Sequence, residues 1–308
     1  MLPLLLAFVA VDLYDLSGQF TPPARAAVSI DRVESPYSNS TLTFDDGRFA
    51  FKKLEPGAYT VSVYVPSRGE ARKTIEVGPG TADEHHRVAV TLDLKESDFV
   101  FGDVMRRRHS VNVKQLAIPD AAKRAYEDAQ RDLAKNDPEA AIAHLNRAVE
   151  LAPEFVSAWN NLGTIAYKQR DLDRAEACFR RALDADETAF EPLVNLGGVL
   201  VNLHKLQEAW KYNVQAVLAR PNDPLANSQL GMTYFELGAL PLAEKHFRKA
   251  LEIDPGHFSQ PQRFLAEIHL RRKDYKAAAA DLEDFLKYHP DWPQATAMRQ
   301  KIAEWRGQ

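Results

Sequence analysis

The chain has 308 residues, with 39 lysines and arginines, 43 aspartates and glutamates, and one cysteine. A net charge of -4 gives no overall basic field that would attract nucleic acid or anionic lipid. One cysteine excludes a disulfide within the chain, and the length is sufficient for two hydrophobic cores. We therefore expect a two-domain protein without a nucleic-acid partner.

The first residues form an apolar stretch that is too short to span a bilayer, so we expect no integral membrane span. The stretch lacks the positively charged start of a secretory signal. We interpret residues 1–8 as a possible signal-peptide remnant and Val9 onward as the first strand, which places the protein in the periplasm, at the cell surface or outside the cell. The alternative is that the whole stretch begins the strand, which leaves the protein in the cytoplasm.

Residues 9–94 alternate between apolar and polar side chains, a period that is typical of β-strands. The runs with this period are Val9–Leu13, Phe49–Phe51, Tyr59–Val65 and Val88–Leu94. Residue pairs and triplets typical of turns separate them, such as Pro56-Gly57. We expect an antiparallel sandwich of short strands, with a turn of the chain at Asp15–Gly18.

The stretch Asp46–Val61 carries a more particular motif. It contains Asp-Gly-x-Phe-x-Phe, followed by Leu-x-Pro-Gly-x-Tyr-x-Val. This motif resembles the carboxypeptidase-regulatory-like, transthyretin-like domain, and Asp15–Gln19 with Val28–Ile30 is similar to that family's opening turn and second strand. The resemblance covers about 9–94. It implies a spacer or adhesion-like module of cell-surface and secreted proteins, without catalysis of its own.

Residues 95–119 have little periodicity, and we expect a linker there. The three arginines Arg106–Arg108 could meet phosphate or anionic lipid, but recognition by basic clusters usually needs more charges. A solvated linker is the favoured interpretation. We expect a protease to cut at these arginines and to release two folded pieces.

From residue 120 onward the same residue types recur every 34 positions. The recurring residues are Ala141, Ala175, Ala209 and Ala243; Ala148, Ala182, Ala216 and Ala250; and Gly163, Gly197 and Gly231. A fixed period of this size is typical of a solenoid, in which each unit buries its apolar face only against its neighbours. Apolar residues three and four apart predict two helices in each unit. We expect Ala209 and Ala243 to face Gly197 and Gly231 where the helices cross most closely.

One unit contains Trp159, Leu162, Gly163, Tyr167, Ala175, Phe179 and Ala182. This pattern resembles the tetratricopeptide repeat, although the middle unit has Asn213 where an aromatic residue is usual. The resemblance covers residues 120–292 and implies five units, at 122–155, 156–189, 190–223, 224–258 and 259–292. Residues 293–308 are expected to form a cap helix, with Ala295, Met298, Ile302 and Trp305 on its apolar face. The predicted fold class is an all-β sandwich followed by an all-α superhelix.

The sequence has no motif that indicates catalysis. It lacks a phosphate-binding Gly-Lys-Ser/Thr loop, a Gly-x-Ser-x-Gly elbow, a His-Glu-x-x-His helix and a Cys-x-x-Cys pair. His85 and His86 are adjacent, so on a strand they would point to opposite faces and could not share a metal. We expect Cys178 to be a packing residue. We therefore predict no enzyme, no cofactor and no metal site.

The resemblance to tetratricopeptide proteins implies that the first helix of each unit lines a concave peptide groove. The inward positions in this chain are Asn160, Asn161, Thr164, Tyr167 and Lys168; Asn195, Val201 and Asn202; and Gln229, Met232 and Phe235. Asn161, Asn195 and Gln229 form a row of carboxamides, which could pair with the backbone of an extended peptide. The alternative is that these amides solvate the helices or connect neighbouring repeats.

Chaperone-binding members of the family use lysine, asparagine and arginine to clamp a C-terminal carboxylate. The corresponding positions here are Tyr126, Gln130, Asn161, Glu191 and Asn195. Only the asparagine fits, so we do not expect a receptor for chaperone tails. We predict a non-catalytic scaffold that binds a protein or peptide in the concave groove, with an oligomeric state that the sequence leaves open. The alternative is an envelope-assembly protein, in which the sandwich docks on a cell-surface component and the repeats pack against other subunits.

Overall fold

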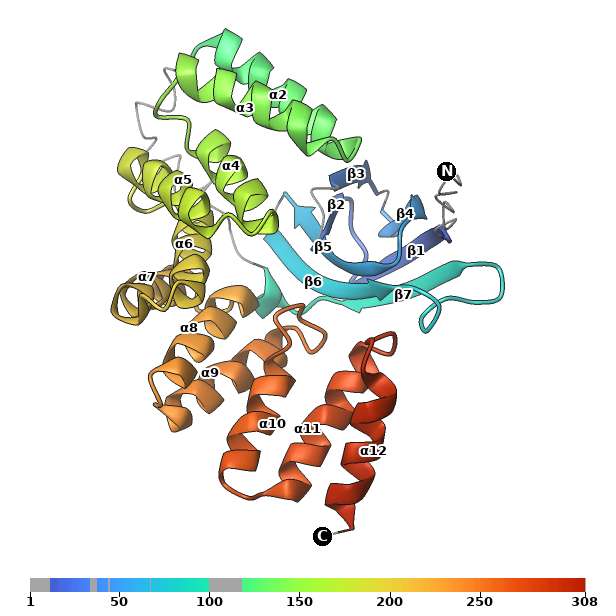
Figure 1. Cartoon of the computed structure of the whole chain (residues 1–308). Coiled ribbons are helices and arrows are strands. Elements are labelled where there is room, and N and C mark those ends of the chain that lie inside the picture. The colour runs from blue at the N-terminus through green and yellow to red at the C-terminus, as the bar shows by residue number, and fades with distance from the viewer. Residues whose placement is uncertain (1–11, 34–37, 44, 67, 100–117, 308) are drawn as a thin grey trace, which may run out of the picture.

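The computed structural model describes residues 12–33, 38–43, 45–66, 68–99 and 118–307. Within this part the chain forms seven strands, one short 3-10 helix, η1 (Glu96–Asp98), and eleven α-helices. The strands form two packed sheets, and the helices follow one another in an arc around them (Figure 1). The predicted fold class, a β-sandwich followed by a helical superhelix, is confirmed.

The first sheet contains β4 (Arg48–Leu54), β1 (Tyr14–Thr21) and β7 (Arg87–Asp93), in that order. β1 pairs with β4 in antiparallel register but with β7 in parallel register, with Leu16 opposite Val88. The expectation of a purely antiparallel sandwich is therefore wrong. A parallel pair needs a long crossover connection. The strands between β1 and β7, most of them in the second sheet, provide that crossover.

Gly18 lies inside β1 and does not form the predicted turn. The alternating burial of Tyr14, Leu16 and Phe20 continues through it. A Cβ atom at Gly18 would lie 2.1 Å from Cζ of Phe49, so the glycine makes room for that ring. Of the strand predicted further upstream, residues 9–11 lie outside the described residues, and the described residues 12 and 13 are not in a strand.

The second sheet is antiparallel and contains β3 (Ser38–Leu42), β2 (Ala27–Arg32), β5 (Gly57–Val65) and β6 (Gly69–Val77), in that order. One face is apolar and packs on the first sheet through Val28, Ile30, Val61 and Val63. The other face is polar. Because neighbouring strands are in register, its side chains form rows across the sheet. Its rows are Ser29, Ser62 and Arg72, and then Asp31, Thr60 and Thr74.

The helices form five antiparallel pairs and one final helix. Their bounds are α2 (Asp120–Ala134) and α3 (Pro138–Leu151), α4 (Val156–Lys168) and α5 (Leu172–Ala185), α6 (Phe190–Asn202) and α7 (Leu206–Ala219), α8 (Pro224–Glu236) and α9 (Leu240–Ile253), α10 (Pro261–Arg271) and α11 (Tyr275–Tyr288), and α12 (Ala295–Arg306). Several helices begin at an aspartate whose side chain accepts a backbone N–H of the first turn, a favourable N-cap. These aspartates are Asp137, Asp171, Asp223 and Asp274.

The glycines of the repeat lie against a large side chain of the second helix. A Cβ atom at Gly231 would lie 2.8 Å from the ring of Phe247. In the middle unit the same place is taken by Asn213, whose Oδ1 would lie 1.9 Å from a Cβ atom at Gly197. The atoms nearest to these glycines thus belong to Asn213 and Phe247, while Ala209 and Ala243 are buried. That the two alanines face the glycines stays a prediction.

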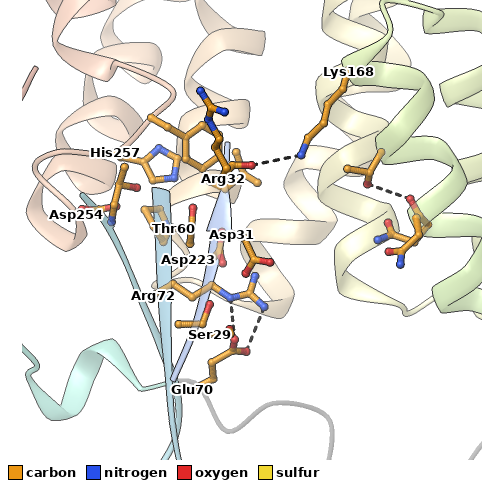
Figure 2. Close-up of a pocket in the computed structure, with 18 of the residues that line it drawn as sticks. Ser29, Asp31, Arg32, Thr60, Glu70, Arg72, Lys168, Asp223, Asp254 and His257 are labelled. Atoms are coloured by element: carbon orange, nitrogen blue, oxygen red, sulfur yellow. Dashed lines mark hydrogen bonds and ion pairs between the residues drawn. The ribbon is translucent and has the colours of Figure 1, made fainter. Parts of the chain in front are cut away.

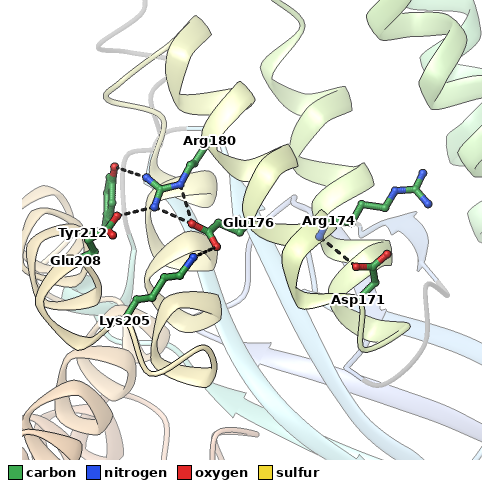
Figure 3. Close-up of polar contacts among 7 residues, drawn as sticks. All are labelled: Asp171, Arg174, Glu176, Arg180, Lys205, Glu208 and Tyr212. Atoms are coloured by element: carbon green, nitrogen blue, oxygen red, sulfur yellow. Dashed lines mark hydrogen bonds and ion pairs between the residues drawn. The ribbon is translucent and has the colours of Figure 1, made fainter.

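A charged cluster connects one unit to the next (Figure 3). Glu176 of α5 accepts hydrogen bonds from Arg180 at 2.8 Å and from Lys205, in the turn before α7, at 2.7 Å. Arg180 also pairs with Glu208 of α7. We call these four residues the α5 charge cluster. A similar arrangement recurs two periods later, at Glu244, Arg248 and Arg272.

Candidate functional site

The polar face of the second sheet is turned toward the inner side of the helical arc (Figure 1). We expected two separate modules, whereas the structure places them in contact. The backbone N–H of Thr74 donates to Oδ2 of Asp254, in the loop after α9, at 3.0 Å. The backbone N–H of Gly80 donates to the carboxylate of Asp291, in the loop after α11, at 2.9 Å.

A third contact joins the same parts of the chain. Nδ1 of His289, a residue only 3% exposed, lies 2.8 Å from Oε1 of Glu76. We call the pairs Thr74–Asp254, Glu76–His289 and Gly80–Asp291 the latch. All three pairs join β6 or its following loop to the fourth and fifth helix pairs. The sandwich is therefore anchored on the C-terminal end of the superhelix.

Two longer contacts reach the earlier helices. Nζ of Lys168, at the end of α4, donates to the carbonyl oxygen of Arg32 at 3.4 Å. The guanidinium of Arg72 lies 3.9 Å from Glu191 of α6. Between the sheet and the helices lies a cavity of about 460 Å³ (Figure 2). We call it the interdomain cavity.

The interdomain cavity has one wall from the sheet and one from the helices, and most of its side chains are polar. The sheet contributes Ser29, Asp31, Arg32, Thr60, Ser62, Glu70, Arg72 and Thr74. The helices and their loops contribute Gln130, Leu133, Asn160, Asn161, Thr164, Ile165, Lys168, Asp223, Pro224, Leu225, Asp254, His257 and Phe258. The arrangement can supply hydrogen-bond donors, acceptors and both signs of charge to a polar ligand.

The carboxylates of the cavity are affected by burial. Burial raises the pKa of Asp254 to about 6, although hydrogen bonds from Thr74 and the charge of Lys73 act in the opposite direction. Burial also raises the pKa of Asp223, against its hydrogen bond from Ala226. The ionised form of both side chains is therefore less stable in the folded protein than in water.

Burial also disfavours the charged forms of two basic groups of the cavity, Lys168 and His257. Burial lowers the pKa of Lys168 to about 8, with Asp31 opposing the change. Burial lowers the pKa of His257 to about 3, so its ring is uncharged at neutral pH and Nδ1 lies 2.6 Å from the hydroxyl of Ser259. Arg72 forms two hydrogen bonds with Glu70, each of 3.1 Å.

The structure brings four of the eleven predicted groove residues to the cavity. These are Asn160, Asn161, Thr164 and Lys168, all from α4. The remaining seven are outside its lining. Tyr167 and Asn202 are exposed, and Val201, Met232 and Phe235 are half-buried in the cores between helices.

The predicted amides also connect neighbouring units, which is the alternative that the sequence left open. Nδ2 of Asn195 donates to Oδ1 of Asn160 at 3.0 Å, and Nδ2 of Asn161 donates to the hydroxyl of Tyr126 at 3.3 Å. The side chain of Gln229 packs on Gly198, where an added Cβ atom would lie 2.6 Å from Nε2. The amides therefore do not form one continuous row toward a ligand.

The sequence analysis did not identify the residues that the sheet contributes to the cavity, nor the aspartates Asp223 and Asp254. Glu70, Arg72, Thr74 and Glu76 occupy alternate positions of β6, a strand that we did not predict. Alternate polar residues of this kind indicate a strand with a solvated or polar-packed face. That pattern was the available signal for the sheet wall.

Among the described residues, no group of three or more histidines, cysteines, aspartates or glutamates is placed to hold a metal ion. The helices in the same part of the chain are all too short or too polar to cross a bilayer. Cys178 is buried, in a cluster with Leu162 and Ile165.

Comparison with known proteins identifies the repeats. The sequence profile of the tetratricopeptide repeat family matches residues 126–190 and again 224–257. Tetratricopeptide repeat protein 5 of Homo sapiens is 28% identical over 180 residues, which are 52% of this chain and 40% of that protein. Hsp70-Hsp90 organizing protein 1 of Glycine max is 30% identical over 144 residues, 47% of this chain and 25% of that protein. The chain thus spans less than half the length of these curated relatives.

A solved structure agrees with these matches. Residues 41 to the end of MamA from Desulfovibrio magneticus RS-1 superpose with a TM-score of 0.51 at 23% identity, over 57% of this chain and 99% of that one. This likeness shows the fold of the helical part. The carboxypeptidase-regulatory-like identity of the sandwich stays a prediction. The helical part of this chain therefore contains tetratricopeptide repeats, at residues 126–190 and 224–257.

Proposed function

We propose that the protein is a non-catalytic scaffold that holds a segment of a protein partner in the interdomain cavity. Tetratricopeptide repeats present a concave surface for such segments. The observation that carries the proposal is the polar lining of the cavity, where amides and hydroxyls face each other from α4 and the sheet. Such groups offer both donors and acceptors, which an extended peptide backbone requires.

The size of the cavity restricts the form of the bound segment. About 460 Å³ lies within the roughly 300–1,000 Å³ of ordinary ligand pockets. A helix with its side chains has a diameter of about 10–12 Å, which is large for this space. We therefore propose an extended segment of a few residues. Asn161 uses one N–H toward Tyr126 and keeps an amide oxygen and a second N–H for such a segment.

The partner that we propose is not a chaperone tail. The relative from Glycine max is named as an organizing protein of Hsp70 and Hsp90. In this chain Glu191 occupies a clamp position and forms an ion pair of 3.2 Å with Arg220. A second carboxylate brought to Glu191 would be repelled.

A pull-down with matched variants tests the proposal. Asn161→Ala removes an amide that lines the cavity, whereas Asn202→Ala removes an amide outside it that bonds Tyr167 in the same way, at 3.3 Å. We expect the first variant to lose partner capture and the second to keep it, with similar unfolding temperatures. Equal capture by both variants would argue against the cavity as the binding site.

The envelope-assembly role remains the second candidate. Leu42 of β3 and Leu218 of α7 are 76% and 75% exposed, and apolar side chains of this kind suit packing against another subunit. Sedimentation of wild type and Leu218→Ser tests this role, because a subunit contact through α7 predicts that the variant dissociates. We also propose an extracytoplasmic location, based on residues 1–8, which lie outside the described residues, and on the resemblance of the sandwich. Cell fractionation tests that location.

A further inference from the structure

One strand of the sandwich lies along the later helix pairs as an extended segment. β6 is an edge strand in the described part of the chain, and it faces these helices (Figure 1). Its alternate residues contact the third, fourth and fifth helix pairs in order along the strand. The contacts are Arg72 with Glu191, the backbone N–H of Thr74 with Asp254, and Glu76 with His289. A single extended segment thus crosses three successive helix pairs, as a peptide bound to a solenoid would.

The helices contact the backbone of this segment as well as its side chains. Asp254 accepts the backbone N–H of Thr74 at 3.0 Å, and both carboxylate oxygens of Asp291 accept the backbone N–H of Gly80 at 2.9 Å. Nζ of Lys73 donates to the carbonyl oxygen at the end of α9. When a protein binds an extended peptide, main-chain hydrogen bonds supply affinity and alternate side chains supply specificity. Both kinds of contact hold β6 on the helices.

The contacts between β6 and the helices are polar and can be exchanged. Among the described residues, each hydrophobic core cluster lies wholly in the sandwich or wholly in the helical part. Interfaces between domains that lack a large hydrophobic area resemble transient interfaces between proteins. The ion pair between Arg72 and Glu191 is 3.9 Å long and partly exposed, and Glu191 also pairs with Arg220, so this contact is weak. A second segment that offers the same groups could therefore replace β6.

We propose that the inner surface of the third to fifth helix pairs binds an extended segment of a partner protein, and that β6 occupies this surface in the closed molecule. The segment that fits has the pattern of β6. It carries a basic residue, a residue that offers its backbone N–H two positions later, and an acidic residue two positions after that. Glu191, Asp254 and His289 receive these three groups in turn. The inference goes beyond the proposed function, because it concerns the surface that the sandwich covers.

Fluorescence anisotropy with a labelled, end-capped peptide of residues 69–80 tests the proposal on the chain of 308 residues. Gly80→Leu disturbs the latch from the sandwich side and leaves the helical surface unchanged, because the added Cβ atom would lie 2.7 Å from Asp291. We expect the peptide to bind this variant about tenfold or more tightly than wild type, in which the tethered β6 competes at a high effective concentration. Equal binding to wild type and variant, or binding to neither, would overturn the proposal.

A control peptide tests whether the binding uses the contacts of β6. It has proline at the position of Thr74, which removes the backbone N–H that Asp254 accepts. We expect the proline peptide to bind Gly80→Leu at least about tenfold more weakly than the peptide with threonine. If the two peptides bind equally, the site is not the surface that β6 covers.

Matched variants separate release of β6 from loss of the site. Asp291→Ala and Gly80→Leu disturb the same contact, but only Asp291→Ala removes an acceptor from the helical surface. We expect the peptide to bind Gly80→Leu about tenfold more tightly than Asp291→Ala, and equal affinities would contradict the proposed surface. Glu76→Gln replaces Gly80→Leu if that variant fails to fold. Its matched control is Glu84→Gln, an exposed glutamate in the loop after β6.

Two further outcomes decide between the possible occupants and between the two proposals. A Gly80→Leu chain that dimerises and excludes the peptide would place β6 of a second copy on the surface, which would overturn the proposal of a partner protein. Asn161→Ala in the Gly80→Leu background should leave peptide binding unchanged. If the peptide binds no variant while the pull-down still separates Asn161→Ala from Asn202→Ala, this inference fails and the proposed function stands.

Discussion

The backbone N–H of Thr74 donates to the carboxylate of Asp254 across 180 residues of sequence, at 3.0 Å. Thr74 lies on β6, which is an edge strand of the sheet in the described part of the chain. Edge strands expose backbone groups that natural proteins cover or block. Asp254 covers this group from the loop after α9, so the superhelix protects the edge of the sandwich as well as anchoring it.

The burial of Asp254 predicts a pH dependence of stability. Burial raises the pKa of Asp254 to about 6 in the folded protein. The stability that the protonated side chain contributes is therefore fully present below the pKa of the unfolded chain, and it is lost as the pH rises through about 6. Asp254→Asn stays neutral and keeps an oxygen for Thr74. We expect the variant to gain about 1 kcal/mol relative to wild type between pH 5 and pH 8.

Urea unfolding at both pH values measures the effect. Asp186→Asn is the matched control, because Asp186 follows α5 at the equivalent position and bonds Thr188 of its own loop. A difference between Asp254→Asn and wild type that is the same at pH 5 and pH 8 would contradict the assignment.

The latch changes what proteolysis is expected to show. Arg106–Arg108 lie outside the described residues, and a cut there was expected to release two pieces. With the latch in place, we expect the pieces to stay associated on gel filtration. A Cβ atom at Gly80 would lie 2.7 Å from Asp291, so Gly80→Leu should weaken the association about tenfold or more. Gly307→Leu is the control, because an added Cβ atom there would meet nothing closer than 3.6 Å. Separation of the wild-type pieces would show that the latch is too weak to hold them.

The repeats could be predicted from sequence because their packing is local and periodic. Each glycine that recurs every 34 residues contacts a side chain of its own unit, as Gly231 contacts Phe247. The packing within a unit can therefore be inferred from a single period of the sequence. The resemblance to tetratricopeptide proteins implied the four α4 residues of the cavity. The charges that they face come from the sheet and from later loops, which no repeat pattern connects.

The errors in the sandwich have one physical origin. Gly18 was interpreted from its local preference, which favours turns, and the residues of β6 were not assigned to a strand. Their actual roles depend on distant partners, since Gly18 accommodates Phe49 and Glu76 contacts His289. Tertiary contacts of this kind override local propensity, and a single sequence does not show which distant residues meet.

The α5 charge cluster predicts a second pH effect, of opposite sign. Burial would raise the pKa of Glu176, but hydrogen bonds from Lys205 and Arg180 lower it below its ordinary value. Its contribution is therefore present at neutral pH and is lost as the pH falls through the folded pKa. Because Lys205 and Arg180 are partly exposed, we expect Glu176→Gln to cost roughly 1–2 kcal/mol at pH 7.

Thermal unfolding at pH 7 and pH 3 checks this effect. Glu187→Gln changes an exposed glutamate close to the end of α5 and should leave the unfolding temperature unchanged. If Glu176→Gln costs as much at pH 3 as at pH 7, the lost stability does not come from the charge.

The middle unit offers a test of helix packing. Asn213 is fully buried and donates to the hydroxyl of Thr233 at 2.9 Å, while its Oδ1 faces Gly197. Gly197→Ala would force these atoms apart and should cost roughly 1–3 kcal/mol. Asn213→Ala removes the obstructing atom together with its hydrogen bond. In the double variant Gly197→Ala should cost little further stability beyond that lost by Asn213→Ala. The two changes in the free energy of unfolding should therefore not be additive.

The single variant Gly197→Ala also tests how the chain divides when it unfolds. In a solenoid, stability is a sum of units and nearest-neighbour interfaces, so damage at Gly197 should separate the helix pairs on either side. The latch joins the sandwich to the fourth and fifth pairs. We therefore expect calorimetry of Gly197→Ala to show α2–α7 unfolding early, and α8–α12 unfolding later together with the sandwich. A single transition at the wild-type temperature would contradict the packing, and a sandwich that unfolds separately from α8–α12 would contradict the latch.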